Sequence, residues 1–558
     1  MVTSFPHPLS GLSIHETNRA RDLVLKLHPG TVIDFRATFL LEPPKAEVKE
    51  FLELEHADRI TSDTPRPARL AQVRYDVIGG SKAAEYHESV IDLLKAKRIS
   101  HQIIGPEHHA GLTVFEFEKL VECVKTSSLF QEKLKAIQLP PGFELVVEPW
   151  PYASGNPDSN FYAFPIPLIP IMDARKNEIP EGPSFTISDP NLIEWQKWRM
   201  RVTFNPREGA VLHDIRYDGR NVLYRLSISD MTVPYADPRA PFHLNNLTLG
   251  CDCLGVIKYF DGVLTKADGS AEVTKNVVCL HEQDNGINWK HTNWRTGRAV
   301  VTRRRELVVQ FIITLANYEY IFAFKFDQAA GIAVEARATG IVSVVNIDAG
   351  KTAPWGNVVS PGALAQNHQH IFCVRIDPAI DGHRNTLVQE ESLPNGMDKR
   401  TNPNGNYYEV RQTPITTSVG VDLAPFNNRV FKVQNLSKRN PVSGKPVGYK
   451  RALFAQHHIW VTNREIGGVA DAAARKEDIL DEDIVVWSVF GLTHNPRVED
   501  WPVMPVEMLQ VDITPSDFFT ENPALDVPSS ADIGSKRVLD RCCADKGLSK
   551  KPGEKSRL

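Results

Sequence analysis

The stretch that decides the fold is Leu307-Val308-Val309-Gln310-Phe311-Ile312-Ile313-Thr314-Leu315-Ala316-Asn317-Tyr318-Glu319-Tyr320-Ile321-Phe322-Ala323-Phe324, the most apolar part of the sequence. Its length raises the question of a membrane span. Gln310, Asn317 and Glu319 interrupt it, and such side chains are costly inside a bilayer. We therefore interpret the stretch as two buried β-strands, and we predict no membrane span.

Strand character extends outward from this stretch over residues 186 to 520. β-branched and aromatic runs recur there between turns rich in Gly, Pro, Asn and Asp, while helix signals are few. Examples of these runs are 211–217, 221–228, 307–314, 341–347 and 484–490. The pattern predicts a mainly β protein whose largest part, residues 186–530, is a β-sandwich.

Two small α/β domains are predicted in front of the sandwich. The first, residues 1–94, alternates helical and strand patterns, with a helix expected at 45–56 after two prolines. The second, residues 95–185, carries helical periodicity and ends in a Pro-rich run. Residues 531–558 are expected to form a flexible tail that ends in Ser556-Arg557-Leu558.

The charge balance argues against nucleic acid as a partner. Lys and Arg number 64 and Asp and Glu 68, so the net charge of -4 offers no basic surface. Seven cysteines are too few for a disulfide framework, and the N-terminus lacks a secretory signal. We expect an intracellular protein that acts on a small molecule or on another protein.

Three histidines are candidate metal ligands. His368 and His370 lie two residues apart in an apolar run, and on a strand this spacing puts both imidazoles on one face. Such a pattern more often marks two hydrogen-bonded polar side chains than a metal site. His494 precedes a turn, where a surface histidine fits equally well. Asn317 and Glu319 need polar partners if their strand is buried, although a half-buried strand with a polar face is the simpler explanation.

Three motifs together resemble the copper amine oxidases, specifically the fungal peroxisomal type. They are Thr314-Leu315-Ala316-Asn317-Tyr318-Glu319-Tyr320, Asn367-His368-Gln369-His370 and Thr493-His494-Asn495-Pro496-Arg497-Val498-Glu499-Asp500-Trp501-Pro502. The resemblance covers nearly the whole chain. It implies that the two small domains are cystatin-like and that the sandwich is catalytic. It also implies oxidative deamination of a primary amine by O2, through a topaquinone Schiff base, to an aldehyde, ammonia and hydrogen peroxide.

The resemblance also implies residue roles. Copper(II) would be held by His368, His370 and His494, and topaquinone would be formed from Tyr318. Asn317 would keep the quinone ring oriented, and Tyr235 would hydrogen-bond its oxygen. An electrophilic quinone is needed because no ordinary side chain accepts an amine as a carbonyl does.

A second, peripheral metal, usually calcium, is implied as well. It would map to Asp377 and Asp483 with the backbone carbonyls of Pro378 and Ile484. A further acidic ligand that is common in the family falls on Ala379 here. The resemblance also implies a disulfide between Cys253 and Cys279 and a homodimer.

The chain departs from the family pattern at three places. About fifteen residues are missing between Phe242-His243 and Asn245-Asn246, where the family carries its catalytic aspartate, and no carboxylate occurs between Asp237 and Asp252. Shortfalls also lie between Tyr449-Lys450 and Ala452-Leu453 and near Glu465-Ile466-Gly467-Gly468. Two functions therefore remain open: an active amine oxidase, or a catalytically impaired copper-binding relative or incomplete gene-model product.

The C-terminal tripeptide bears on localisation. Ser556-Arg557-Leu558 is close to the Ser-Lys-Leu peroxisomal address, with one basic residue in place of another. We predict that a peroxisomal import receptor binds it and that the protein is peroxisomal, which suits a reaction that releases peroxide.

Overall fold

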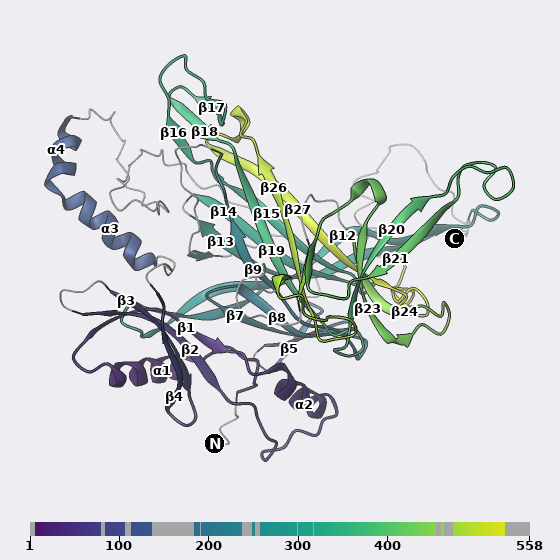
Figure 1. Cartoon of the computed structure of the whole chain (residues 1–558), viewed down its shortest axis with the longest axis horizontal. Helices are drawn as coiled ribbons and strands as arrows, with labels where there is room; N and C mark the ends of the chain where they lie inside the picture. Colours follow the sequence, from purple (N-terminus) through teal and green to yellow (C-terminus); the bar gives the residue numbers. More distant parts are fainter. Residues whose placement is uncertain are drawn as a thin grey trace, which may run out of the picture.

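The computed structural model describes residues 6–79, 84–105, 113–136, 183–189, 191–236, 248–250, 257–297, 299–315, 317–452, 459–462 and 473–529. Antiparallel sheets dominate these residues, and a small α/β unit precedes them, so the predicted fold class is confirmed (Figure 1). None of the helices in the described ranges combines the length and apolar character that a membrane span requires.

The N-terminal unit pairs four strands in sequence order and carries two helices. A Ser13–Glu16 capping box starts the first helix, because Ser13 accepts the Glu16 backbone N–H while the Glu16 carboxylate accepts that of Ser13. The second helix begins directly after Pro43-Pro44, as the sequence predicts. These elements are α1 (Ile14–Leu27), β1 (Val32–Leu41), α2 (Lys45–His56), β2 (Leu70–Ile78), β3 (Glu85–Asp92) and β4 (Lys97–Ile103).

The first sheet extends past the boundary expected after residue 94. β4 pairs with β3 through a tight turn in which the Asp92 carboxylate accepts the backbone N–H groups of Leu94 and Lys95. The expected boundary therefore falls inside the β3–β4 hairpin, and β4 is part of the first sheet. The helical patterns that follow form α3 (Val114–Thr126) and α4 (Ser128–Ala136). Residues 137–182 lie outside the described part, so the division into domains stays a prediction.

Two large sheets form the C-terminal part. The 9-stranded sheet has the order β22-β25-β26-β19-β9-β8-β7-β6-β5, and the 11-stranded sheet has the order β11-β12-β13-β14-β15-β27-β24-β23-β20-β21, with β10 on β13. The strands of the first are β5 (Thr186–Ser188), β6 (Leu192–Trp195), β7 (Trp198–Asn205), β8 (Gly209–Tyr217), β9 (Arg220–Thr232), β19 (His368–Pro378), β22 (Val419–Val421), β25 (Ile459–Thr462) and β26 (Val485–His494). Those of the second are β10 (Thr248–Gly250), β11 (Lys258–Thr265), β12 (Ala271–Thr292), β13 (Ala299–Leu315), β14 (Tyr318–Asp327), β15 (Ile332–Ile341), β20 (Thr386–Pro394), β21 (Tyr408–Pro414), β23 (Val430–Arg439), β24 (Pro446–Ala452) and β27 (Val503–Ser516).

The stretch 307–324 forms two paired strands, as predicted. β13 and β14 run antiparallel with Leu315 opposite Tyr318, so the chain reverses between these two residues. The run 341–347, predicted as one strand, is divided. β15 ends at Ile341, and β16 (Val344–Asn346) joins a separate 3-stranded sheet with β17 (Gly356–Ser360) and β18 (Ala363–Gln366).

The faces of β14 and β19 pack against each other inside the sandwich. Alternate residues at the start of β14 meet alternate residues at the start of β19, because strand side chains alternate between faces. The Phe322 and Phe372 rings lie 5.3 Å apart, and the Tyr320 ring lies 5.4 Å from His370. One continuous core of buried apolar residues joins the two sheets.

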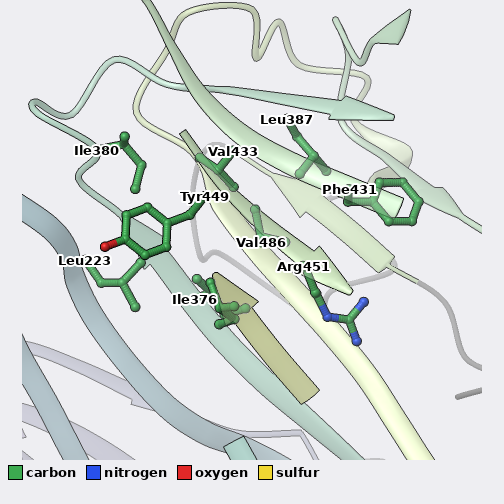
Figure 2. Close-up of a pocket in the computed structure, with 10 residues that line it drawn as sticks. Leu223, Ile376, Ile380, Leu387, Phe431, Val433, Tyr449, Arg451 and Val486 are labelled. Carbon is green, nitrogen blue, oxygen red and sulfur yellow. The ribbon is translucent and has the colours of Figure 1, made fainter. Parts of the chain in front are cut away.

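A second part of that core contains a charged side chain. Aliphatic side chains of both sheets, among them Leu223, Ile376 and Val486, surround Tyr449 and Arg451 (Figure 2). The Arg451 guanidinium is buried, and none of its three nitrogens has a hydrogen-bond partner among the described residues. Burial lowers the pKa of Arg451 to about 9. A buried cation without a partner destabilises the fold, and Arg451 adjoins the predicted shortfall before Ala452.

We expect Arg451→Met to stabilise the protein by about 1 to 3 kcal/mol, because an apolar side chain of similar length removes the desolvation cost of the guanidinium. Urea unfolding of the purified chain measures the change. The control is Lys432→Met on the neighbouring β23, which should destabilise because Lys432 pairs with Glu390 at 2.6 Å. Equal destabilisation by both variants would contradict the assignment of Arg451 as unpaired.

Candidate metal centre and active site

Three histidines from two adjacent strands meet in the interior. His368 and His370 share one face of β19, and His494 at the end of β26 lies directly opposite His368 in the strand register. All three are buried, with exposed fractions of 2%, 0% and 2%. The structure therefore brings the three predicted ligands together, and one ring nitrogen from each lies within 4.8 Å of the others.

Glycine 491 allows this pairing. A Cβ atom on Gly491 would lie 2.1 Å from the backbone oxygen of His370, which is far inside van der Waals contact. Any larger residue there would push β26 away from β19. The glycine therefore sets the separation of the strands that carry the histidines.

Hydrogen bonds define which ring nitrogens carry protons. The Nδ1 atom of His368 lies 2.8 Å from the Gln366 carbonyl, which can only accept, so Nδ1 donates and Nε2 is bare. The Nε2 atom of His494 donates to the Asp500 carboxylate at 3.1 Å, which leaves Nδ1 bare. These two bare nitrogens face each other at 3.2 Å.

This arrangement fits a metal ion. Two facing lone pairs repel unless a cation lies between them, and Nε2 of His370 is buried with no hydrogen-bond partner in the described part of the chain. Burial lowers the pKa of His368 to about 4 and that of His370 well below its usual value, so both rings are neutral near pH 7. Neutral imidazole is a good ligand for copper, and the three bare nitrogens are the atoms that would hold it.

Asp500 orients His494, a role that the sequence analysis missed. Its side chain is fully buried and accepts the Arg497 backbone N–H and the Arg497 guanidinium, both at 2.7 Å. Burial alone would raise the pKa of Asp500, but these hydrogen bonds and that of His494 lower it to about 2. The ionised carboxylate fixes the tautomer of His494. The sequence did contain a signal for this role, because Asp500 is a carboxylate that follows the candidate ligand His494 by six residues, across a predicted turn.

Tyr318 reaches the histidines from the facing sheet. Its hydroxyl lies 3.1 Å from the bare Nε2 of His368 and 3.4 Å from the Ser343 backbone N–H. Burial raises the pKa of Tyr318 well above its ordinary value, so it is protonated and donates to His368. Gly340 makes room for it, since a Cβ there would lie 2.9 Å from the Tyr318 Cα.

Tyr235 and Tyr320 complete the group of aromatic side chains. The Tyr235 ring stacks on His368 with centroids 4.8 Å apart. Hydrogen bonds with Ser343 and Tyr318 lower the pKa of Tyr235, but burial outweighs them and raises it. The Tyr320 hydroxyl lies 2.9 Å from Nδ1 of His370, a contact that the two-residue spacing from Tyr318 could have predicted.

Asn317 occupies the reversal between β13 and β14. Its backbone carbonyl accepts the Ile341 N–H at 2.8 Å, which ties the turn to β15. The role predicted for its side chain, to orient the ring formed from Tyr318, stays a prediction. The neighbouring Glu319 is half-buried, and Thr314 donates a hydrogen bond to its carboxylate at 2.8 Å.

The residues predicted for a peripheral metal come together around an ammonium group instead. Asp377 near the end of β19 accepts a hydrogen bond from Lys45 Nζ at 2.5 Å, and Asp483 accepts one from the same atom. Pro378 ends β19 and Ile484 is buried just before β26, so each directly follows one of these two acids in the sequence. A cation from the chain itself stands between the two acids, so the arrangement does not fit calcium.

Several predicted features lie outside the described residues. They are Asp237, the position of the missing aspartate segment, Cys253 and the C-terminal tripeptide. Cys279 is buried, and its Sγ lies 3.7 Å from Nδ1 of His281. The disulfide with Cys253 stays a prediction.

Comparison with known proteins identifies relatives of this chain. The profile of the "Copper amine oxidase, enzyme domain" family matches residues 186–465 and 450–534. The chain is 52% identical to Copper amine oxidase 1 of Aspergillus niger over 96% of this chain and 99% of that protein. This chain belongs to the copper amine oxidase family.

Two further relatives agree with this membership. The chain is 34% identical to the peroxisomal primary amine oxidase of Pichia angusta over 70% of this chain and 67% of that protein. A copper-containing benzylamine oxidase from Hansenula polymorpha superposes with a TM-score of 0.85 at 32% identity, over 94% of this chain and 100% of that one. The Aspergillus niger alignment spans 664 positions, whereas this copper amine oxidase has 558 residues, so the relative has stretches without a counterpart here.

We expect Asp500→Asn to lower copper affinity about 10- to 100-fold, because an amide no longer holds the His494 tautomer firmly. Competition with a chromophoric copper chelator at pH 7 measures it. Glu499→Gln, an exposed neighbour, is the matched control and should leave affinity unchanged. Unaltered affinity in Asp500→Asn would show that Asp500 does not orient the ligand.

Proposed function

We propose that this protein is a primary-amine oxidase that converts a primary amine, O2 and water into an aldehyde, ammonia and hydrogen peroxide. The observation that carries the proposal is the contact between the Tyr318 hydroxyl and the bare nitrogen of His368 inside a cluster of three buried histidines. Membership of a family of copper-dependent amine oxidases supports it.

Copper and topaquinone fit the residues present. When bound, copper and the quinone formed from Tyr318 supply a redox-active metal and an electrophilic carbonyl that no ordinary side chain provides. His368, His370 and His494 would hold the metal through their bare nitrogens. The Tyr235 hydroxyl and the Ser343 N–H lie at the Tyr318 oxygen and would keep the ring in one orientation.

A specific observation favours the second candidate, a catalytically impaired relative. Removal of a proton from the substrate carbon needs a positioned base, typically worth about 10²- to 10⁴-fold in rate. No carboxylate occurs between Asp237 and Asp252, where the family resemblance places that base. On this reading the chain binds copper and modifies Tyr318 but turns over slowly.

We expect copper and O2 to convert Tyr318 into the quinone in the chain as written. Mass spectrometry of the peptide and a quinone redox stain should both report the modified ring. Tyr318→Phe should abolish both signals, whereas Tyr320→Phe, a matched loss of one hydroxyl in the same strand, should keep the stain. An unmodified Tyr318 in copper-loaded protein would contradict the proposal.

The two candidate functions separate in a peroxide assay on the same samples. Peroxide production from benzylamine should rise at least about 100-fold when the segment of the Aspergillus niger relative is inserted at residues 243–246, because it restores the base. Equal rates with and without the insertion would show that the chain as written is a competent enzyme. Peroxide in neither sample would leave copper binding as the function.

We also propose that the protein is a peroxisomal homodimer. The name of the Pichia angusta relative and the Ser556-Arg557-Leu558 tripeptide support the compartment, and the family resemblance supports the dimer. Deleting the three residues from a fluorescently tagged chain should move it from peroxisomes to the cytosol. A Leu558→Ala variant should do the same, and an unchanged distribution would remove the tripeptide as the signal. Light scattering of the purified protein reports the dimer.

A further inference from the structure

We propose that Lys45 of α2 is a built-in cation that takes the place of a peripheral metal and locks the N-terminal unit onto the catalytic sandwich. The proposal concerns stability and does not depend on the proposed amine oxidation.

The Lys45 ammonium group has three partners from the sandwich. It donates to Asp377 at 2.5 Å and to Asp483, and it lies 4.7 Å from the centre of the Tyr224 ring. Asp377 is 4% exposed in its side chain and Asp483 46%, so the first pair is largely shielded from water. Arg375 also approaches Asp377 at 3.2 Å. Negative charge at this site is therefore already matched without a metal ion.

The position where the family often has a further acidic calcium ligand, residue 379, packs against apolar side chains in this protein. Ala379, where the family often has an acid, is buried in a cluster with Val48 and Leu52 of α2, Leu9 and Tyr224. Lys45, Val48 and Leu52 are spaced three and four residues apart, so they lie on one face of the helix. The same helix face thus supplies both the cation and the apolar contacts, and an acid at residue 379 would be buried against it.

The far end of α2 is also bonded to the sandwich. Glu55 pairs with Arg201 at 2.6 Å, and His56 lies 2.8 Å from Asp214. The helix is therefore attached at both ends. Burial and the nearby Lys45 and Lys49 charges lower the pKa of His383 to about 3, so His383 stays neutral beside the ammonium group.

The proposal is tested by a double-mutant cycle on the full-length, copper-loaded protein. Lys45→Met should lower the melting temperature by several degrees, because it removes one of the two cations beside the buried Asp377 carboxylate and leaves only Arg375 at 3.2 Å. In the Asp377→Asn background the same substitution should cost much less. Lys45→Arg should retain most of the wild-type melting temperature. Lys49→Met, a lysine on the same helix, is the control and should change it little.

Calcium supplies the second measurement. The wild-type melting temperature should be the same in 5 mM CaCl2 and in its absence, since the site already holds a cation. A calcium-dependent rise that Asp377→Asn abolishes would overturn the proposal, because it would show a metal at these carboxylates. Additive losses in Lys45→Met and Asp377→Asn would also overturn it.

Discussion

The packing of one face of β14 against one face of β19 is the interaction on which the rest of the structure depends. Tyr318 meets His368, Tyr320 meets His370, and Phe322 meets Phe372, so the candidate site continues the aromatic core without a break. The site exists only while the two sheets stay in register. A shift of either strand by one residue would turn every one of these side chains to the opposite face.

Exclusion of water by this packing sets the chemistry of the site. Burial keeps His368 and His370 neutral and Tyr318 protonated, the states in which nitrogen lone pairs are available to a metal. Asp500 remains ionised in the same interior only because Arg497 and His494 donate to it. Arg451 has no hydrogen-bond partner among the described residues, and burial lowers its pKa. Burial therefore keeps the histidine nitrogens available to a metal and also destabilises the core at Arg451.

The N-terminal unit takes part in the stability of the catalytic region. Its helix α2 touches β9 and the end of β19, the strand that carries two of the three histidines. Because β19 also pairs with β26, which carries the third, the Lys45 contact is connected to the candidate metal centre through continuous strands. Loss of the Lys45 contact would loosen the end of β19, whereas the His368 end is held by its pairing with His494.

The sequence by itself determined the mainly β fold, the two strands of residues 307–324, the α2 helix and the three histidines. These features follow from local patterns: alternation of apolar residues reports which face of a strand is buried, and a pair of prolines reports where a helix can begin. The resemblance of three short motifs to the copper amine oxidases then implied the amine-oxidation chemistry. It did not reveal how each imidazole is held.

Only the tertiary structure decided the features that join distant parts of the chain. Asp500 acts on His494 across a turn, β4 continues the first sheet, and Lys45 meets Asp377 and Asp483 from another unit. No local pattern encodes such contacts, because a lysine at the start of a helix looks the same whether it faces water or two carboxylates. The register and packing of whole sheets bring these groups together, and that is why a site expected to hold calcium holds an ammonium group instead.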